Sequence, residues 1–135
     1  MSIEKNKQVV SEFFQNFSAA NIDAALNLLD DNATWRVMGT KGELPISGVM
    51  NKEGIGSLIK MVKEAMPEGL KLTANGWTIQ DNRVAVEIES YGKIEASQKV
   101  YNNFYHFLIE LKEEKIISVK EYMDTLHVKE IFIDN

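Results

Sequence analysis

The sequence predicts an α+β protein in which helices of the first half pack on one face of a curved, mostly antiparallel sheet built by the second half. Two changes along the chain support this: apolar residues recur at helical spacing in the first half and at strand-like alternation in the second. The length of 135 residues and a hydrophobic fraction of 44% are typical of one folded domain. We therefore expect a single domain over residues 1–135.

Three helices are predicted in the first half. Ser2 can cap the first, and Asn21 can end it and cap the second. The third begins near Asn51 and is stopped by Pro67 and Gly69. The apolar stripes expected to face the core are Val10, Phe13, Phe14 and Phe17; Ala25, Leu28 and Leu29; and Ile55, Leu58, Ile59 and Val62.

The second half predicts an antiparallel meander closed by a short helix. Asp81-Asn82 has the composition of a two-residue hairpin turn, and Glu113-Glu114 separates the last two strands. The expected strands are Leu70–Ile79, Arg83–Tyr91, Lys99–Leu111 and Lys115–Met123, and the expected helix is Leu126–Ile131.

Composition argues against several classes of function. The chain has no cysteine, which removes disulfides, thiolate chemistry and cysteine metal sites. The net charge is −5 and Lys and Arg are scattered, so we expect no nucleic-acid partner. No apolar run approaches the length of a membrane span and no signal-peptide pattern opens the chain, so we expect a cytoplasmic protein with no membrane partner. Metal-ligand spacing, a phosphate-binding loop and a nucleophile elbow are absent from the sequence, so no metal or cofactor is expected.

Strand alternation places one aromatic and apolar face of residues 99–111 toward the interior. Asn103 is the sole polar side chain on this face. Its amide either reads a ligand or forms a hydrogen bond that fixes a bend in the sheet, and the sequence favours neither reading. The expected inward residues are Tyr101, Asn103, Tyr105, Phe107, Ile109 and Leu111.

Glu121 is the most informative residue of the last strand. Ile117, Val119 and Met123 share its face, so an apolar interior would carry Glu121 inward with them. Burial disfavours a carboxylate and raises its pKa toward the range useful for proton transfer. The alternative is a buried ion pair with Arg36 or Arg83, the two arginines of the chain.

Three segments together resemble the SnoaL-like and ketosteroid-isomerase-related branch of the nuclear-transport-factor-2-like superfamily. They are Asp30–Gly39, with its W-x-x-x-G strand, Tyr101–Phe107, written Y-x-N-x-Y-x-F, and Lys115–Thr125, written K-I-x-x-x-x-E-Y-x-D. The resemblance implies a cone-shaped fold, in which a strongly bent sheet wraps around the helices and leaves a small-molecule pocket between them. It also implies a homodimer formed through the outer face of the sheet, where we expect Phe104 and the apolar set Val84, Val86 and Ile88.

The resemblance implies roles for individual residues. In related limonene epoxide hydrolases and phenazine-biosynthesis proteins, the acid that aligns with Glu121 does acid/base work. The epoxide hydrolases add an arginine and an aspartate at the positions of Glu87 and Glu89, so the second acid is kept here and the arginine is absent. We expect Glu89 to point inward, where it could share a proton with Glu121. If it points outward, Glu87 and Glu89 form a solvated face.

Two further positions depart from the family or carry a second interpretation. Trp35 stands where the epoxide hydrolases place a water-holding tyrosine, and an indole donates one hydrogen bond but accepts none, so a wall of the pocket is its expected role. Asp124 is a candidate ligand contact, although a cap for the last helix explains it better. Glu113-Glu114 replaces the usual Asp-Gly of the family, which predicts a longer or a strained turn.

Three functions remain open at this point: an acid/base isomerase, cyclase or hydrolase acting through Glu121 on a small, largely apolar molecule; a non-catalytic binding module; and a structural dimer with a vestigial pocket. In the enzymatic reading, Tyr101, Tyr105 or Asn103 would supply the donor that stabilises an oxyanion. Glu121 and Glu89 are the catalytic candidates. The expected ligand contacts are Trp35, Tyr101, Asn103, Tyr105, Met123 and Asp124, with Phe14 or Phe17 from the first helix.

Overall fold

A computed structural model describes residues 2–40 and 44–134 of the chain. Helices dominate its first half and strands its second, as the periodicity predicted. The elements are α1 (Ile3–Ser18), α2 (Ile22–Leu26), β1 (Leu29–Val37), β2 (Gly48–Met50), α3 (Lys52–Ala65), β3 (Lys71–Gln80), β4 (Arg83–Lys93), β5 (Val100–Tyr101), β6 (Phe104–Lys112), β7 (Lys115–Met123), α4 (Thr125–Val128) and the π-helical turn η1 (Lys129–Ile133).

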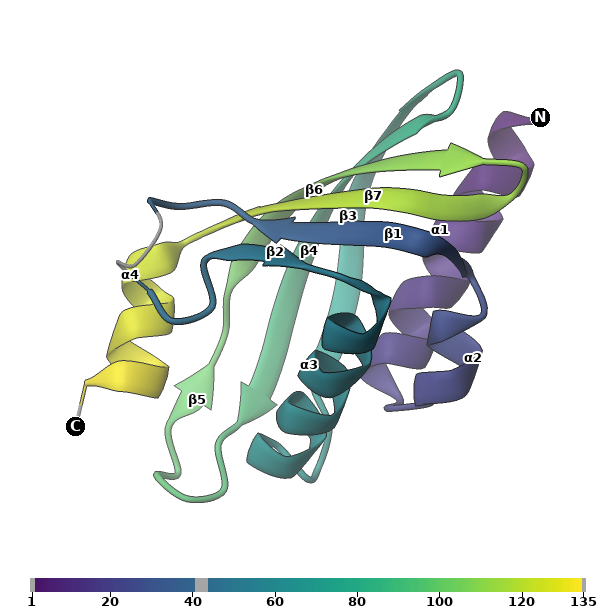
Figure 1. Cartoon of the computed structure of the whole chain (residues 1–135). Coiled ribbons are helices and arrows are strands. Elements are labelled where there is room, and N and C mark those ends of the chain that lie inside the picture. The colour runs from purple at the N-terminus through teal and green to yellow at the C-terminus, as the bar shows by residue number, and fades with distance from the viewer. Residues whose placement is uncertain (1, 41–43, 135) are drawn as a thin grey trace.

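The strands form one curved, mixed sheet in the order β2-β1-β7-β6-β4-β3, with β5 paired to β4. Every described pair is antiparallel except β1 with β7, which run parallel. Helices α1, α2 and α3 lie against the inner side of the sheet, and α4 with η1 lies at the end of the sheet away from α1 (Figure 1). This is the predicted α+β architecture, in which the bent, unclosed sheet leaves space between its inner face and the helices.

The N-terminal helices begin where their capping residues predict. The hydroxyl of Ser2 accepts a hydrogen bond from the Lys5 N–H at 3.0 Å, and the Asn51 side chain accepts one from Gly54 N at 2.8 Å. Asn21 stands at the start of α2 but makes no such bond there. That helix is also shorter than its stripe suggested, because Leu29 already begins β1.

Alternation along the strands settles which side chains face the helices. Val84, Val86 and Ile88 are at most 3% exposed and point inward, so their expected place on an outer dimer face is wrong. On β7, Val119 is buried as predicted, but Ile117 is not, because the pairing of β6 and β7 shifts by one residue beside it and turns Ile116 inward instead. The predicted inner face of residues 101–111 is confirmed in full.

The single strand predicted over Lys99–Leu111 is interrupted at Asn102 and Asn103. There the Asn103 Oδ1 atom accepts the N–H of Phe104, and the Asn102 amide donates to the Ser90 carbonyl oxygen at 2.7 Å. Side-chain amides thus replace part of the regular backbone ladder, and β5 and β6 pair with β4 on either side of this break.

The turn between β6 and β7 contains two residues, Glu113 and Glu114, with φ angles of 51° and 65°. Both lie in the left-handed region, where a side chain with a Cβ atom is strained. Of the two outcomes that the sequence allowed, the turn is therefore strained and not lengthened.

Replacing this turn by Asn-Gly, with Glu113→Asn and Glu114→Gly together, should raise the free energy of unfolding by about 1 kcal/mol, because these residues adopt positive φ at less cost. Urea denaturation of both proteins measures the difference. The double variant Glu113→Gln, Glu114→Gln is the control, since it removes the same two charges but keeps both Cβ atoms at positive φ, and it should leave the free energy unchanged. Equal gains in both variants would attribute the effect to charge and contradict the backbone explanation.

Candidate functional site

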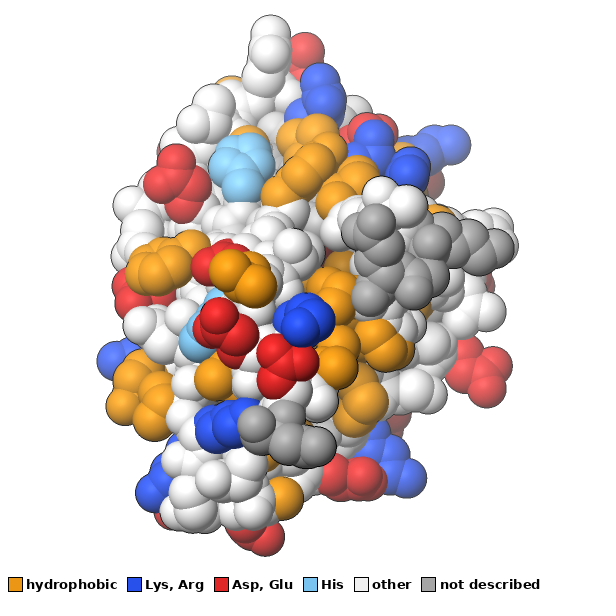
Figure 2. All heavy atoms as spheres, turned by 90° about the vertical axis from the view of Figure 1, so that its left-hand side faces the viewer, with side chains coloured by type: hydrophobic (Ala, Val, Ile, Leu, Met, Phe, Trp, Pro, Cys, Tyr) orange, Lys and Arg blue, Asp and Glu red, His pale blue; other side chains and the backbone are white. Residues whose placement is uncertain are grey.

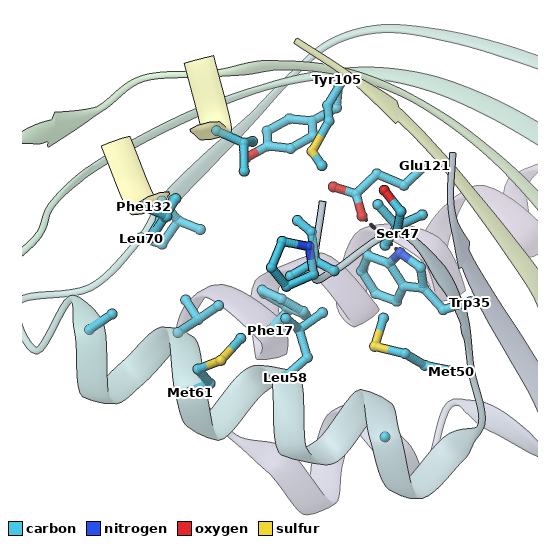
Figure 3. A pocket seen from close by; sticks show the side chains of 18 of the residues that line it. Phe17, Trp35, Ser47, Met50, Leu58, Met61, Leu70, Tyr105, Glu121 and Phe132 are labelled. Atoms are coloured by element: carbon cyan, nitrogen blue, oxygen red, sulfur yellow. Dashed lines mark hydrogen bonds between the residues drawn. The ribbon is translucent and has the colours of Figure 1, made fainter. Parts of the chain in front are cut away.

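A cavity of about 740 Å³ lies between the inner face of the sheet, helix α3 and the C-terminal segment. Most of its lining side chains are apolar. They come from α1, β1, the segment 45–50, α3, β6, β7 and η1 (Figure 3). The polar groups that reach its wall include the carboxyl of Glu121, the indole N–H of Trp35 and the hydroxyls of Tyr101, Tyr105 and Ser47.

Glu121 is buried in this wall, with 8% of its surface exposed. Burial raises the pKa of its carboxyl from 4.5 to about 7, and the hydrogen bond from the Trp35 indole opposes that rise. The bond runs from Trp35 Nε1 to Glu121 Oε1 over 2.9 Å. No ion pair with Glu121 occurs in the described part of the chain, so the predicted alternative, a buried pair with Arg36 or Arg83, is wrong.

Trp35 is held in place by its neighbours on β1 and by aromatic rings. Its indole ring lies 6.0 Å from Phe13, 5.7 Å from Phe17 and 5.8 Å from Phe107, measured between ring centroids. The ring is 2% exposed and lines the cavity, so it forms part of the wall as predicted. Its single N–H is committed to Glu121, which orients that carboxyl toward the cavity.

Tyr101 and Tyr105 line the cavity and share a hydrogen-bonded chain with Ser90. The Tyr105 hydroxyl lies 2.6 Å from that of Tyr101 and 3.0 Å from Ser90 Oγ. Burial raises the pKa of both tyrosines, so both stay protonated near neutral pH. The three hydroxyl groups carry three protons, but only two hydrogen bonds join them. One proton, at one end of the chain, is therefore not used within it.

The remaining proton is best placed on Tyr101. Asn103 Nδ2 donates to the Tyr101 hydroxyl over 3.1 Å, so Tyr101 already acts as an acceptor. If Ser90 donates to Tyr105 and Tyr105 donates to Tyr101, only the Tyr101 proton is unused, and Tyr101 faces the cavity. Ser90 Oγ already accepts the N–H of Asn103 at 3.1 Å, which favours Ser90 as the donor to Tyr105. In this arrangement the Tyr101 hydroxyl is the end of the chain that keeps an unused proton.

Asn103 and Asp124 have structural roles. The Asn103 amide is 1% exposed, donates to Tyr101 and to the Asp124 carbonyl oxygen, and accepts from Phe104. These bonds agree with the second reading of Asn103 from the sequence, a hydrogen bond that fixes a bend in the sheet. Asp124 caps α4 by accepting from His127 N at 3.1 Å, as its second interpretation predicted. Neither Asn103 nor Asp124 lines the cavity, whereas Met123 does.

Glu89 lies on the outer face of β4, so its expected inward placement is wrong. The neighbouring Ile88 and Ser90 point inward, and alternation turns Glu89 the other way. Its carboxylate accepts a hydrogen bond from Asn102 Nδ2 at 3.0 Å. Glu89 therefore cannot share a proton with Glu121 across the cavity.

The sequence did not predict the part of the cavity wall that α3, η1 and the segment 45–48 form. Leu58 and Met61 of α3 and Phe132 and Ile133 of η1 line it, as does the segment 45–48 (Figure 3). The spacing of Leu58, Met61, Val62 and Ala65 was a signal for a second apolar face on α3. Viewed from the C-terminal side, the molecule shows hydrophobic side chains grouped among charged ones (Figure 2). Ile46, Met61, Phe132 and Ile133 are among the exposed apolar residues that line the cavity.

A metal site of clustered side chains and a membrane-spanning helix are two features that residues 2–40 and 44–134 lack. These residues contain no group of three His, Cys, Asp or Glu side chains placed to hold a metal ion. They also form no helix that is both long and apolar enough to span a bilayer.

Solved structures with the same fold cover nearly the whole chain. An NTF2-like protein from Burkholderia xenovorans LB400 is 22% identical, with 97% of this chain and 98% of that chain covered and a TM-score of 0.78. Bal32a, from a soil-derived mobile gene cassette, is 19% identical over 96% and 98%, with a TM-score of 0.83. TerC, co-crystallised with polyporic acid, is 16% identical over 94% and 97%, with a TM-score of 0.80. These likenesses define an NTF2-like fold.

The family follows from the sequence match. The model of the SnoaL-like domain matches residues 10–119, from the second half of α1 to the middle of β7. The chain therefore belongs to the SnoaL-like domain family, and the predicted SnoaL-like resemblance is confirmed. Comparison with curated proteins gives no match.

The raised pKa of Glu121 makes stability depend on pH. Between pH 4.5 and about 7 the folded protein keeps the Glu121 proton that the unfolded chain has lost. The folded state binds more protons in this window, so the free energy of unfolding should fall as pH rises through it, by about 3 kcal/mol in total, and level off above it.

Glu121→Gln should remove this dependence, because an amide keeps the shape and the bond from Trp35 but carries no titrating proton. The variant should match the wild type near pH 4.5 and exceed it in stability above pH 7.5. Thermal unfolding from pH 4.5 to 8.5 measures both curves, and Glu87→Gln, at an exposed acid of β4, is the control. Parallel curves for wild type and Glu121→Gln would show that the buried acid titrates normally.

Proposed function

We propose that the cavity binds a small, largely apolar molecule and that Glu121 moves a proton on it. The observation that carries this proposal is an acid with a pKa of about 7, buried in the wall of a 740 Å³ cavity and without an ion-pair partner among residues 2–40 and 44–134. A group with a pKa near the working pH can both take and return a proton. When Glu121 is ionised, its carboxylate would accept a proton from a ligand carbon beside a carbonyl group.

The surroundings of Glu121 support this chemistry. Trp35 orients the carboxyl, and the free proton of Tyr101 provides a donor elsewhere in the wall. When Glu121 removes a proton from carbon, the electron pair moves to the carbonyl oxygen and forms an enolate. A hydrogen-bond donor that reaches that oxygen stabilises the charge. Return of the proton to carbon completes an isomerisation or an exchange.

A second candidate function is non-catalytic ligand binding by the same cavity. It is favoured by the outward position of Glu89 and by the missing arginine at Glu87, which leave Glu121 as the one carboxyl group on the cavity wall in the described residues. TerC, which shares the fold, was co-crystallised with polyporic acid. By analogy, an aromatic, oxygen-bearing compound would suit this cavity in either function.

Proton exchange in D₂O separates the two functions. The probe is 2-tetralone, a neutral bicyclic ketone with acidic protons beside its carbonyl. Wild-type protein should accelerate exchange of these protons, measured by NMR, and Glu121→Gln should lose on the order of 100-fold of that acceleration. The Glu87→Gln variant should behave as wild type. Binding of the probe without accelerated exchange would support the binding module and contradict the catalytic proposal.

We also propose that the chain forms a homodimer through the outer face of the sheet. Phe104 and Tyr122 are 59% and 45% exposed there, on the neighbouring strands β6 and β7. Exposed aromatic side chains on neighbouring strands are typical of interfaces. Because Val84, Val86 and Ile88 point inward, the dimer proposal rests on the exposed rings of Phe104 and Tyr122.

Light scattering at micromolar concentration should give the mass of two chains. Phe104→Glu should shift it to one chain, because a charge at the centre of an apolar interface is left unpaired. Circular dichroism must remain unchanged, since the side chain is exposed and its loss does not affect the core. A wild-type mass of one chain at these concentrations contradicts the dimer.

A further inference from the structure

The cavity is buried at the end that holds Glu121 and reaches the surface between α3 and η1. Trp35 and Glu121 are 2% and 8% exposed, whereas Met61 of α3 and Phe132 of η1 line the same cavity and are 51% and 45% exposed. Met61 and Phe132 lie on one side of the cavity, and Trp35 and Glu121 lie on the other (Figure 3). The side chains of Met61 and Phe132 therefore form a mouth of the cavity.

The wall between this mouth and the acid carries no charge. Among the described residues that line the cavity, Glu121 has the one charged side chain. Leu58 and Val62 share a face of α3 with Met61, and they line the cavity as well. A ligand that reaches from Glu121 to the mouth therefore passes along apolar surface. A charged group on this path would lose its hydration without gaining a partner.

Phe132 is held at the mouth by contacts outside the cavity. Its ring packs edge-on against the ring of Tyr101, with 4.9 Å between the centroids. The ammonium group of Lys99 donates to the carbonyl oxygens of Glu130 and Asp134 at 3.0 and 2.8 Å, which ties η1 to the segment before β5. Phe132 can thus contact a ligand without first being ordered, and ordering is a cost that lowers affinity.

We propose that the ligand is elongated, with its carbonyl group at Glu121 and an uncharged apolar tail that passes between Met61 and Phe132. The inference rests on the proposed function, and it adds the shape of the ligand and the direction in which it lies. Apolar side chains that are exposed at the mouth are covered when the tail lies on them, and this burial adds to the affinity. Met61 and Phe132 are then specificity-determining residues for the length of the ligand.

Probes of increasing length test this arrangement. 2-Tetralone, 6-butyl-2-tetralone and 6-hexyl-2-tetralone share the reactive ketone and differ in the chain at the far end of the ring system. Equilibrium dialysis gives the dissociation constant of each. The variant is Met61→Gln, which keeps the length of the side chain but makes its end polar. Ile3→Gln is the control, because Ile3 is a helical residue of similar exposure, 52%, that does not line the cavity.

For the wild type, the dissociation constant should fall about twofold to fourfold with each methylene group that the protein covers. Met61→Gln should raise the dissociation constant of the hexyl probe about fivefold and that of 2-tetralone by a much smaller factor, because only the chain reaches the polar amide. Ile3→Gln should change neither. The wild type should also accelerate proton exchange on the hexyl probe, since its ketone lies at Glu121.

Three results would overturn the position of the tail. They are an affinity that does not depend on chain length, an equal effect of Met61→Gln on 2-tetralone and the hexyl probe, and tight binding of the hexyl probe without proton exchange. Each leaves the proposed function standing if the wild type accelerates exchange on 2-tetralone and Glu121→Gln does not.

The converse outcome is also distinguishable. If the wild type binds the probes but accelerates no exchange on 2-tetralone, the catalytic proposal fails, while the chain-length series and Met61→Gln still decide where the tail lies. Failure of all three probes to bind the wild type overturns the proposed function and this inference together.

Discussion

The inner face of the bent sheet is broader than the helices that cover it, and this mismatch shapes the molecule. Helix α1 packs against β3, β4 and β7, whereas α3 packs against β1 and β2 at the other edge. The inner side chains of β6 and the end of β7 lie between these two contacts and meet a cavity of about 740 Å³. Apolar groups there line the cavity, and Phe107 of β6 also packs against Phe14 of α1, with 4.8 Å between the ring centroids.

The same geometry determines the electrostatics of the site. Glu121 occupies an inward position of β7, so the apolar surroundings that bury its neighbours also disfavour its charge. A single indole N–H compensates only part of that cost. Stability and the proposed chemistry therefore oppose each other at this residue, since the burial that makes the acid useful also destabilises its ionised form.

A second consequence concerns the aromatic strand. The break at Asn102 and Asn103 uses the side-chain amides to satisfy backbone groups that the regular ladder leaves unpaired. The Asn103 amide also donates to the Tyr101 hydroxyl, which belongs to a residue that lines the cavity. The break in the strand is thus connected by hydrogen bonds to a polar group of the cavity wall.

The sequence by itself determined the three N-terminal helices, the antiparallel meander of the second half, the inner face of residues 101–111 and the inward position of Glu121, because these depend on local periodicity and alternation. It could not determine the side of Glu89, since β4 alternates apolar residues with acids and either face could have been buried. Strand breaks and bulges, such as those at Asn103 and Ile117, follow from pairing with strands distant in sequence. Tertiary structure alone brought Trp35 and Glu121 into contact, because parallel pairing of β1 with β7 joins segments more than 80 residues apart.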